Sequence, residues 1–236
     1  QQIPEVLTIE GPEAYCENKR PLLNLDVFET LHLTEEDRNR TILYQTENKR
    51  RRLKTQTTDL NEYLKSLKTH VMIQPADSFS IPRIAQLTKR TNQFNLTTRR
   101  YSEADIRTFV ESRKKRVYYL KSRDRFGDHG IVGVCIVHIE NDCWELDTFL
   151  MSCRVIGRGI ENAFLYDICQ KASQDSMKSV VGRYFPTPKN KMAEGFYSKA
   201  GFEVLVDHPK SKVCTFNLRK ASLPLPIHIK VSNYAN

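Results

Sequence analysis

The sequence predicts an α/β protein, with a mostly helical segment over residues 1–65 followed by one domain with a central mixed sheet over residues 66–236. Three observations support this fold class. The chain up to Lys65 is polar and helix-like, whereas from Thr69 on short apolar runs alternate with helical patterns. Three consecutive strand-like runs are joined by two short polar turns, which favours antiparallel neighbours. A further observation is an apolar run ending near Cys153 that passes through two glycines into a helical pattern, as in a strand-to-helix connection.

The N-terminal segment is predicted to contain one long polar helix and one short helix. The long helix begins after Thr34, which suits an N-cap, with Asp37 at the capping-box position, and it ends in the basic run of residues 49–54. That run holds no aromatic residues, so we interpret it as a solvated helix end rather than a nucleic-acid patch. Asp59 is the expected cap of the short helix over residues 60–68.

The domain is predicted to have the element order β-αα-βββ-α-β-α-ββ, starting with a strand over residues 70–76. Ser80 and Ser102 are the expected caps of the two helices that follow, and Pro82 suits the opening turn of the first. Three strands then lie within residues 116–152. The remaining elements are a helix over 159–175, a strand over 179–185, a helix over 191–201 and strands over 202–207 and 213–220.

The cysteines and the hydropathy pattern exclude several classes of protein. Six cysteines are scattered without the spacing of a zinc site, which favours reduced thiols in a cytoplasmic protein and no metal. No apolar run approaches the roughly 18 residues that a membrane-spanning helix needs. The polar start is not that of a signal peptide. We therefore expect a cytoplasmic protein without membrane association.

The positive charge is concentrated in the domain. The formal net charge is +9, with 10 Lys+Arg against 12 Asp+Glu up to Lys65 and therefore 27 against 16 beyond it, a net of +11. This positive charge suits an anionic partner, such as nucleic acid, a phosphorylated cofactor or an acidic carrier protein. A solvated basic surface without a specific partner is the simpler alternative. No interleaved aromatic residues or known motif indicate nucleic acid, so we expect no nucleic-acid partner.

The stretch "FLMSCRVIGRGIENAF" has the features of an anion-binding turn. Gly157 and Gly159 let backbone N–H groups approach a ligand without obstruction by a Cβ atom, and the helix that follows directs its unpaired N–H groups and positive dipole end outward. Arg154 and Arg158 flank the glycines. The alternative is an ordinary tight turn, which also requires glycine.

A second stretch, "PKNKMAEGFYSKAGFEVL", contains the pattern N-x-x-A-x-x-F-Y-x-x-x-G-F and resembles the hallmark of the Gcn5-related N-acetyltransferase superfamily. "RVIGRG" resembles that superfamily's R-x-x-G-x-G pyrophosphate loop, and the element order from Thr69 is also similar. The resemblance implies an acetyltransferase-like fold with a mostly antiparallel mixed sheet, and a cofactor that is CoA or a phosphopantetheine thioester. The residues implied to bind that cofactor are Arg154, Val155, Ile156, Gly157, Arg158, Gly159 and Asn190.

The same resemblance places the pantetheine arm between the strands "WELDTFLMS" and "SVVGRYF", which would splay apart there. It also implies that Tyr197 is the general acid for a leaving thiolate. A phenol suits that role because it stays protonated near neutral pH. The alternative for Tyr197 is an ordinary half-buried tyrosine of a helix.

A narrower resemblance extends over nearly the whole chain. "FETLHLTEEDRNRTILYQ", "IAQLTKRTNQFNLTTRRYSEADI", "RDRFGDHGIVGV" and "DTFLMSCRVIGRGIE" are similar to the FkbH-like family, in which a haloacid-dehalogenase-type phosphatase domain precedes an acyltransferase-like domain. Members transfer a glyceryl group from 1,3-bisphosphoglycerate, without its phosphate, to an acyl carrier protein in polyketide-type biosynthesis. The D-x-D nucleophile motif of the phosphatase is missing from this chain, so no phosphatase activity is expected of it.

Three sets of residues are candidates for the chemistry. Cys153, just before the glycine loop, lies near a helix N-terminus and two arginines, which favours a nucleophilic thiol and a covalent acyl intermediate, although a packed strand-end cysteine is the alternative. Glu145 and Asp147 lie on one strand face at i and i+2 and are candidate bases, with His129 a weaker one. The third set is a polar cluster between two predicted helices, which consists of Asn92, Gln93, Asn95, Thr97, Thr98, Arg99 and Arg100. We expect it to bind a hydroxylated acyl group, and the alternative is a loop rich in helix-capping residues.

The sequence therefore predicts the acyltransferase part of an FkbH-like protein, which transfers a glyceryl-type acyl group to the phosphopantetheine of an acyl carrier protein. Two alternatives remain open. One is an acetyl-CoA-dependent N-acetyltransferase of the same fold, and the other is a non-catalytic module that docks the carrier for a phosphatase domain. An acidic carrier protein agrees with the basic domain.

Overall fold

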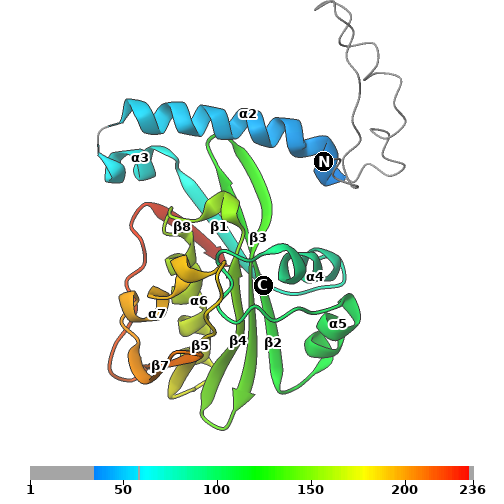
Figure 1. Cartoon of the computed structure of the whole chain (residues 1–236), viewed down its shortest axis with the longest axis vertical. Helices are drawn as coiled ribbons and strands as arrows, with labels where there is room; N and C mark the ends of the chain where they lie inside the picture. The colour runs from blue at the N-terminus through cyan, green and yellow to red at the C-terminus, as the bar shows by residue number, and fades with distance from the viewer. Residues whose placement is uncertain (1–34, 58, 234–236) are drawn as a thin grey trace, which may run out of the picture. The chain divides into compact units, whose positions relative to one another are not determined.

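The computed structural model describes residues 35–57 and 59–233, with side chains from residue 46 on (Figure 1). The long polar helix is confirmed as α2 (Glu35–Gln56), and the part of the chain from Thr46 on forms one compact unit. The predicted cap at Thr34 lies outside the described residues. The predicted domain boundary between residues 65 and 66 stays a prediction. Within the described ranges, none of the helices has the length and apolar character needed to span a membrane.

An eight-stranded sheet forms the centre of the compact unit, in the order β6-β7-β5-β4-β3-β2-β1-β8. All neighbouring strands are antiparallel except the parallel pairs β4–β5 and β1–β8, so the predicted mixed, mostly antiparallel sheet is confirmed. The strands are β1 (Thr69–Pro75), β2 (Lys115–Asp124), β3 (Gly127–Glu140), β4 (Cys143–Met151), β5 (Ser179–Tyr184), β6 (Glu203–His208), β7 (Ser211–Asn217) and β8 (Ile229–Asn233).

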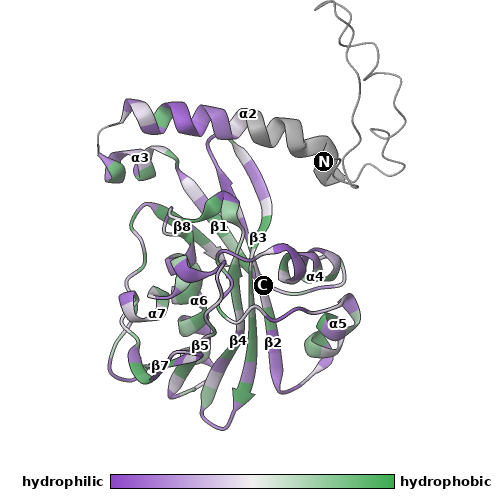
Figure 2. Cartoon of the chain, in the orientation of Figure 1, coloured by the Kyte–Doolittle hydropathy of each residue, from purple (hydrophilic) through white to green (hydrophobic). Residues whose placement is uncertain are grey.

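Helices cover both faces of the sheet (Figure 1). On one face α4 (Ile81–Arg90) and α5 (Glu103–Glu111) pack against β2 and β3, and on the other α6 (Ile160–Gln174) packs against β1, β5 and β8. The shorter helices are α3 (Leu60–Ser66), α7 (Phe196–Lys199) and the 3₁₀ turns η3 (Cys153–Val155) and η4 (Lys191–Ala193). Figure 2 shows apolar residues gathered along the central strands and α6.

The core lies mainly between the sheet and α6. Phe164 and Leu165 of α6 are fully buried in one cluster with Trp144 and Phe149 of β4, and the rings of Phe149 and Phe164 lie 5.2 Å apart. Burying each such side chain stabilises the fold by about 1.5–3 kcal/mol. This packing fixes β4 against α6.

The helix caps are confirmed in two of three described cases. Asp59 accepts a hydrogen bond from the Asn61 N–H at 2.9 Å, and Ser102 forms a capping box with Asp105. Ser80 occupies the predicted N-cap position of α4, but its side chain makes no cap hydrogen bond, because its hydroxyl is hydrogen-bonded to the backbone of Asp77. A tight turn before the helix competes with the cap for the same hydroxyl.

The fold differs from the prediction in two further elements. Strand β8 was not expected, since it is a five-residue run that joins the sheet by parallel pairing with β1. The helix predicted over residues 191–201 is broken into η4 and α7. Gly195, at the start of α7, lies between the two pieces and disfavours a continuous helix.

A buried ion network joins α2 to the β2–β3 turn and corrects the interpretation of residues 49–54 as wholly solvated. Arg50 is 2% exposed and donates to the Asp124 carboxylate at 2.6 and 2.9 Å. His129 and Arg158 contact the same carboxylate at 3.1 and 3.4 Å. Burial alone would raise the pKa of Asp124, but hydrogen bonds from His129 and Arg50 hold it well below its usual range. His129 is thus a structural residue rather than an accessible base.

Candidate functional site

The predicted strand-to-helix turn is present at the carboxyl end of β4. Gly157 and Gly159 have φ values of 76° and 77°, a left-handed conformation that favours glycine. A Cβ atom on Gly159 would also lie 3.3 Å from the His228 ring. Helix α6 begins directly afterwards at Ile160. The turn therefore has the backbone geometry of an anion-binding loop at a helix N-terminus.

The chain supplies its own anion to this loop. The backbone N–H groups of Glu161, Gly157 and Gly159 favour the charged form of the Glu161 carboxylate and act to lower its pKa. Burial nevertheless raises the pKa of Glu161, and its second oxygen, Oε2, is buried without a hydrogen-bond partner among the described residues. A ligand phosphate at these amides would have to displace Glu161.

The predicted cofactor residues of the loop lie in different surroundings. The Arg158 side chain points away from the glycines and contacts Asp124 and, at 3.3 Å, Glu47, while its carbonyl accepts a hydrogen bond from His228 Nε2 at 2.8 Å. Val155 is fully buried in the core and Arg154 is half-buried. The Arg158 side chain is thus engaged in ion pairs away from the glycines, and the cofactor-binding role of the loop residues stays a prediction.

A groove of about 360 Å³ lies beside the loop, between α6 and α7. Gly157 and Glu161 line it at the loop, Phe196 and Lys199 line it on α7, and the proline-containing segment 223–226 forms a further wall. The groove is mostly apolar apart from Lys199, Asn162 and Glu161. It has the size and lining of a small-molecule site.

The space between the splayed ends of β4 and β5 is filled by the chain itself, which corrects the expectation of a pantetheine arm there. Residues 94–97 run between the two strands and are hydrogen-bonded to both. Leu96 N–H donates to the Phe149 carbonyl at 3.1 Å, Met151 N–H to the Phe94 carbonyl at 2.9 Å and Phe185 N–H to the Leu96 carbonyl at 2.8 Å. Backbone groups that an open slot would offer to a ligand are therefore already paired. We call residues 94–97 the slot segment.

Asn190, the predicted cofactor contact, holds the slot segment in place. It is fully buried, and its side-chain Nδ2 donates to the Asn95 carbonyl at 2.9 Å and to the Phe185 carbonyl at 3.0 Å. Its Oδ1 accepts from Thr187 N–H at 2.7 Å and from the Tyr184 hydroxyl at 3.2 Å. With donors and acceptor engaged, the Asn190 side chain has a structural role in this conformation.

Tyr197, the predicted general acid, lies inside the core. It is 2% exposed, and its ring packs on the backbone of Gly182 in β5, where a Cβ atom would lie only 2.4 Å from the ring. Its hydroxyl is buried without a hydrogen-bond partner among the described residues, and burial raises the pKa of the phenol well above its usual value. Tyr197 therefore resembles the alternative of an ordinary packed tyrosine, except that it is fully buried rather than half-buried.

Cys153 contrasts with the other described cysteines. It is exposed at the start of η3, two residues beyond the end of β4, whereas Cys135, Cys169 and Cys214 are buried and Cys143, at the other end of β4, is half-buried. Ile156 and Gly157, which follow in the same turn, line the groove between α6 and α7. The structure thus presents the Cys153 thiol to solvent just outside the closed slot.

The two candidate bases do not share one environment. Glu145 accepts two hydrogen bonds from Arg183 at 2.8 and 3.0 Å, which lower its pKa and make it a weak base. Asp147 is the extra residue of a β-bulge in β4, since Ile136 pairs with Thr148 and Val137 with Leu146. The bulge breaks the strict alternation that had put Glu145 and Asp147 on one face.

Asp147 is the centre of a buried polar group beside the slot segment. Its carboxylate accepts hydrogen bonds from Arg99 and, at 2.7 Å, from the Tyr101 hydroxyl, and its carbonyl accepts from Thr97 Oγ1 at 2.8 Å. Burial, followed by the hydrogen bond to Asp147, raises the pKa of Tyr101 to about 12. The carboxylate is therefore held by an arginine and a protonated phenol.

The predicted substrate-binding cluster is partly structural. Asn95 is fully buried and bonds to the backbone of Thr91 and Thr98, and Asn92 accepts from Arg100. Gln93 is exposed, and Thr98 and Arg99 are half-buried. Most of these side chains thus form local hydrogen bonds within the loop, as the alternative predicted. Gln93 and Arg99 are accessible to a ligand from solvent.

Sequence reasoning missed two features that decide the state of the site, Glu161 and the slot segment. An acidic residue in the first turn of a helix is common, so Glu161 gave no signal beyond its place after the glycines. The slot segment is joined to β4 by a single isolated bridge, between Asn95 and Leu150, which leaves no periodic pattern to detect. Among the described residues, no three His, Cys, Asp or Glu side chains gather as a metal site would require.

Comparison with known proteins identifies the fold. No family model matches the chain, and no curated protein matches it in sequence. The solved ribosomal-protein-S18-alanine N-acetyltransferase from Escherichia coli matches with a TM-score of 0.50 and 12% identity, over 64% of this chain and 96% of that chain. A chimera of the spermidine N-acetyltransferase SpeG from Vibrio cholerae matches with a TM-score of 0.50 and 10% identity, over 64% and 96%. A domain from Methanocaldococcus jannaschii matches with a TM-score of 0.50 and 11% identity, over 63% and 99%.

These likenesses confirm the predicted acetyltransferase-like fold. The FkbH-like assignment stays a prediction from the sequence.

Proposed function

We propose that this chain is an acyltransferase of the FkbH-like type, in which Cys153 carries a glyceryl-type acyl group as a thioester and passes it to the phosphopantetheine thiol of an acyl carrier protein. The observation that carries the proposal is the exposed Cys153 thiol at the end of β4, next to the glycine loop and outside the slot that residues 94–97 close. A reaction there needs no passage through the sheet.

The proposed reaction consists of two exchanges at one sulfur atom. The Cys153 thiolate attacks the carbonyl carbon of an activated acyl donor, the bond to the leaving group breaks, and the leaving group departs with the electron pair. The thiolate of the pantetheine arm then attacks the same carbon, an S–acyl bond to the carrier forms, and the Cys153 thiolate is released. Each attacking thiol loses one proton, and each departing anion regains one.

The groove between α6 and α7 suits the pantetheine arm. It is apolar along most of its length, and it reaches the loop at Gly157, four residues after Cys153. When bound, phosphopantetheine would supply the accepting thiol, and the loop amides that now favour the Glu161 carboxylate would be available to its phosphate if that carboxylate moved aside. An acidic carrier protein complements the excess of Lys and Arg over Asp and Glu beyond Lys65.

The closed slot separates this proposal from the acetyl-CoA-dependent alternative. A thioester carried between β4 and β5 would have to break the hydrogen bonds of residues 94–97 to Phe149, Met151 and Phe185. The buried Tyr197 hydroxyl gives no support to an acid at the centre of the sheet. Both observations favour chemistry at the outer end of β4.

The closed slot and the Glu161 carboxylate in the loop also favour a second candidate, the non-catalytic module that docks a carrier protein. In that case the groove and the basic charge bind the carrier protein, and the chain catalyses no acyl transfer. Cys153 distinguishes the two functions, because a docking module does not require its thiol.

The experiment uses a glyceryl thioester of N-acetylcysteamine as donor and pantetheine as acceptor, with mass spectrometry of the product. We expect glyceryl-pantetheine to form with the native chain and with Cys143→Ser, and not with Cys153→Ser. Cys143 is the matched control because it lies at the opposite end of the same strand. Equal formation by Cys153→Ser would overturn the acyl-Cys153 step. Acetylation of amines from acetyl-CoA, without acyl transfer to pantetheine, would support the N-acetyltransferase instead.

A further inference from the structure

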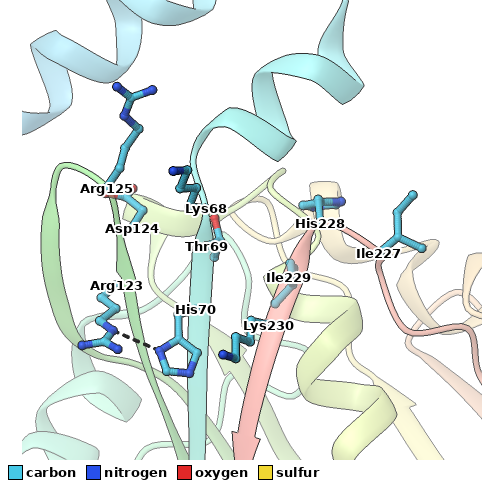
Figure 3. A pocket seen from close by; sticks show the side chains of 10 residues that line it. All are labelled: Lys68, Thr69, His70, Arg123, Asp124, Arg125, Ile227, His228, Ile229 and Lys230. Atoms are coloured by element: carbon cyan, nitrogen blue, oxygen red, sulfur yellow. Dashed lines mark hydrogen bonds between the residues drawn. The ribbon is translucent and has the colours of Figure 1, made fainter.

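A basic pocket lies at the edge of the sheet where β1, β2 and β8 meet (Figure 3). It is an open hollow of about 620 Å³, and its basic lining residues are Lys68, His70, Arg123, Arg125, His228 and Lys230. It is separate from the groove between α6 and α7, whose lining residues it does not share. We call this hollow the basic pocket.

Three of these residues form a row across neighbouring strands. His70 of β1 is the register partner of Arg123 on β2 and of Lys230 on β8, so the three side chains lie on one face of the sheet. Figure 3 shows the three side chains next to one another, with His70 between Arg123 and Lys230. Arg123 and Lys230 are thus two cations on the same face of the sheet, one on each side of His70.

His70 orients Arg123 rather than adding a third charge. Its Nδ1 accepts a hydrogen bond from Arg123 Nε at 3.0 Å, and its Nε2 contacts the Ser232 hydroxyl. Burial, together with the charges of Arg123 and Lys230, lowers the pKa of His70, which favours the neutral ring that this acceptor role requires. The terminal amino groups of the Arg123 guanidinium remain for a ligand, since within the described part of the chain only its Nε has a hydrogen bond.

The one acidic residue of the lining does not neutralise the pocket. The Asp124 side chain is 1% exposed, and Arg50, His129 and Arg158 already contact it. Across residues 46–57 and 59–233, no carboxylate forms an ion pair with Lys68, Arg123, Arg125 or Lys230. The positive charge of the pocket is therefore uncompensated by the protein.

We propose that the basic pocket binds a small phosphate monoester, with its phosphate group between Arg123 and Lys230. A planar guanidinium held at Nε donates two parallel hydrogen bonds to phosphate oxygens, and a lysine ammonium adds a point charge. The volume of about 620 Å³ exceeds the need of phosphate alone and leaves room for an organic group against Ile227 and Ile229. The concave shape and small extent favour a small molecule over a nucleic acid, whose backbone needs an extended basic track.

The test is titration calorimetry of the native chain with glycerol 3-phosphate and with inorganic phosphate, at low and at moderate salt. Arg123→Gln and Lys230→Gln are the pocket variants. Lys210→Gln is the matched control, because Lys210 is an exposed lysine in the β6–β7 turn at the opposite edge of the sheet. We expect saturable binding of glycerol 3-phosphate that each pocket variant weakens about tenfold or more and the control leaves unchanged. Weaker binding of inorganic phosphate would show that the organic group contributes, and equal binding that the phosphate group alone is recognised.

A second measurement follows the imidazole of His70 by NMR. A bound dianion favours the charged ring, so glycerol 3-phosphate should raise the pKa of His70 from its lowered value. An unchanged His70 titration at a saturating ligand concentration would overturn the placement of the phosphate between Arg123 and Lys230.

Other outcomes contradict the proposal as a whole. Absence of binding would do so, as would equal weakening by Lys210→Gln, which would indicate a diffuse charge effect. Binding of a single-stranded oligonucleotide but not of glycerol 3-phosphate would indicate a nucleic-acid surface. The basic pocket does not involve Cys153, so Cys153→Ser should bind glycerol 3-phosphate like the native chain. That control keeps the outcome independent of the acyl-transfer proposal.

Discussion

The backbone N–H of Met151, the last residue of β4, donates to the carbonyl of Phe94 at 2.9 Å. This bond joins the splayed end of β4 to a segment more than fifty residues earlier in the chain. Together with the bonds of Leu96 to Phe149 and Phe185, it closes the space between β4 and β5 in which the sequence resemblance implies a pantetheine arm. With the slot closed, the proposed acyl transfer lies at the carboxyl end of β4, where Cys153 is exposed, rather than at the centre of the sheet.

Asn190→Ala should destabilise the protein by about 2–4 kcal/mol. The substitution leaves the buried carbonyls of Asn95 and Phe185 without the donor that they share, and each unsatisfied buried group costs about 1–3 kcal/mol. Urea unfolding followed by circular dichroism measures the change. Asn162→Ala on the exposed surface of α6 is the control and should leave stability nearly unchanged. A loss below 1 kcal/mol for Asn190→Ala would show that the slot segment is not held by this amide.

Gly182→Ala should also destabilise the protein, by about 1–3 kcal/mol, because its Cβ atom would overlap the Tyr197 ring. Gly195→Ala is the matched control, since a Cβ atom there would meet only the flexible Lys199 side chain. Replacing Tyr197 by Leu in the Gly182→Ala background should recover part of the loss. Equal effects of Gly182→Ala and Gly195→Ala on the unfolding free energy would rule out the predicted overlap.

Tyr197→Phe should leave acyl transfer unchanged and should raise stability. Burial of a hydroxyl without a partner costs about 1–3 kcal/mol, and the phenylalanine removes that cost while keeping the ring. The rate of glyceryl-pantetheine formation and the midpoint of urea unfolding are the two measurements. A large loss of rate at unchanged stability would restore Tyr197 as the general acid.

Glu161→Gln should raise stability more at pH 7 than at about pH 4. A carboxyl whose pKa is raised by folding binds its proton more tightly in the native state, so it destabilises the fold above the folded-state pKa and has no such effect below the unfolded value of about 4.3. The glutamine carries no charge at either pH. Unfolding free energies of the native chain and the variant at both pH values test this, and a difference that does not grow with pH would contradict it.

The fold could be predicted from the sequence because its signals are local. The capping box at Ser102, the strand-like alternation of β2 to β5 and the glycines at 157 and 159 each depend on a few neighbouring residues. Elements that depend on distant partners were missed. Strand β8 pairs with β1, which lies at the other end of the domain sequence. The cap at Ser80 is absent for a local reason, because its hydroxyl bonds to the backbone of Asp77 instead.

The site was less predictable for the same reason. The motif residues Asn190 and Tyr197 occupy the expected elements, but the Asn190 side chain bonds to residues 94–97, which no pattern connects to β4, and the Tyr197 ring packs on the backbone of Gly182. Likewise the turn around Gly157 was foreseen, whereas the Glu161 carboxylate within it depends on one side-chain conformation. Charge counts predicted a basic domain but not the row of Arg123, His70 and Lys230, which strand register alone creates.

The acyl-Cys153 proposal is tested most directly by peptide mass spectrometry of the native chain after brief incubation with a glyceryl thioester of N-acetylcysteamine and quenching in acid. We predict one added glyceryl group, located on the peptide that contains Cys153 and lost again when pantetheine is added. Absence of that adduct under conditions where glyceryl-pantetheine forms, or a glyceryl group on Cys143 instead, would contradict it.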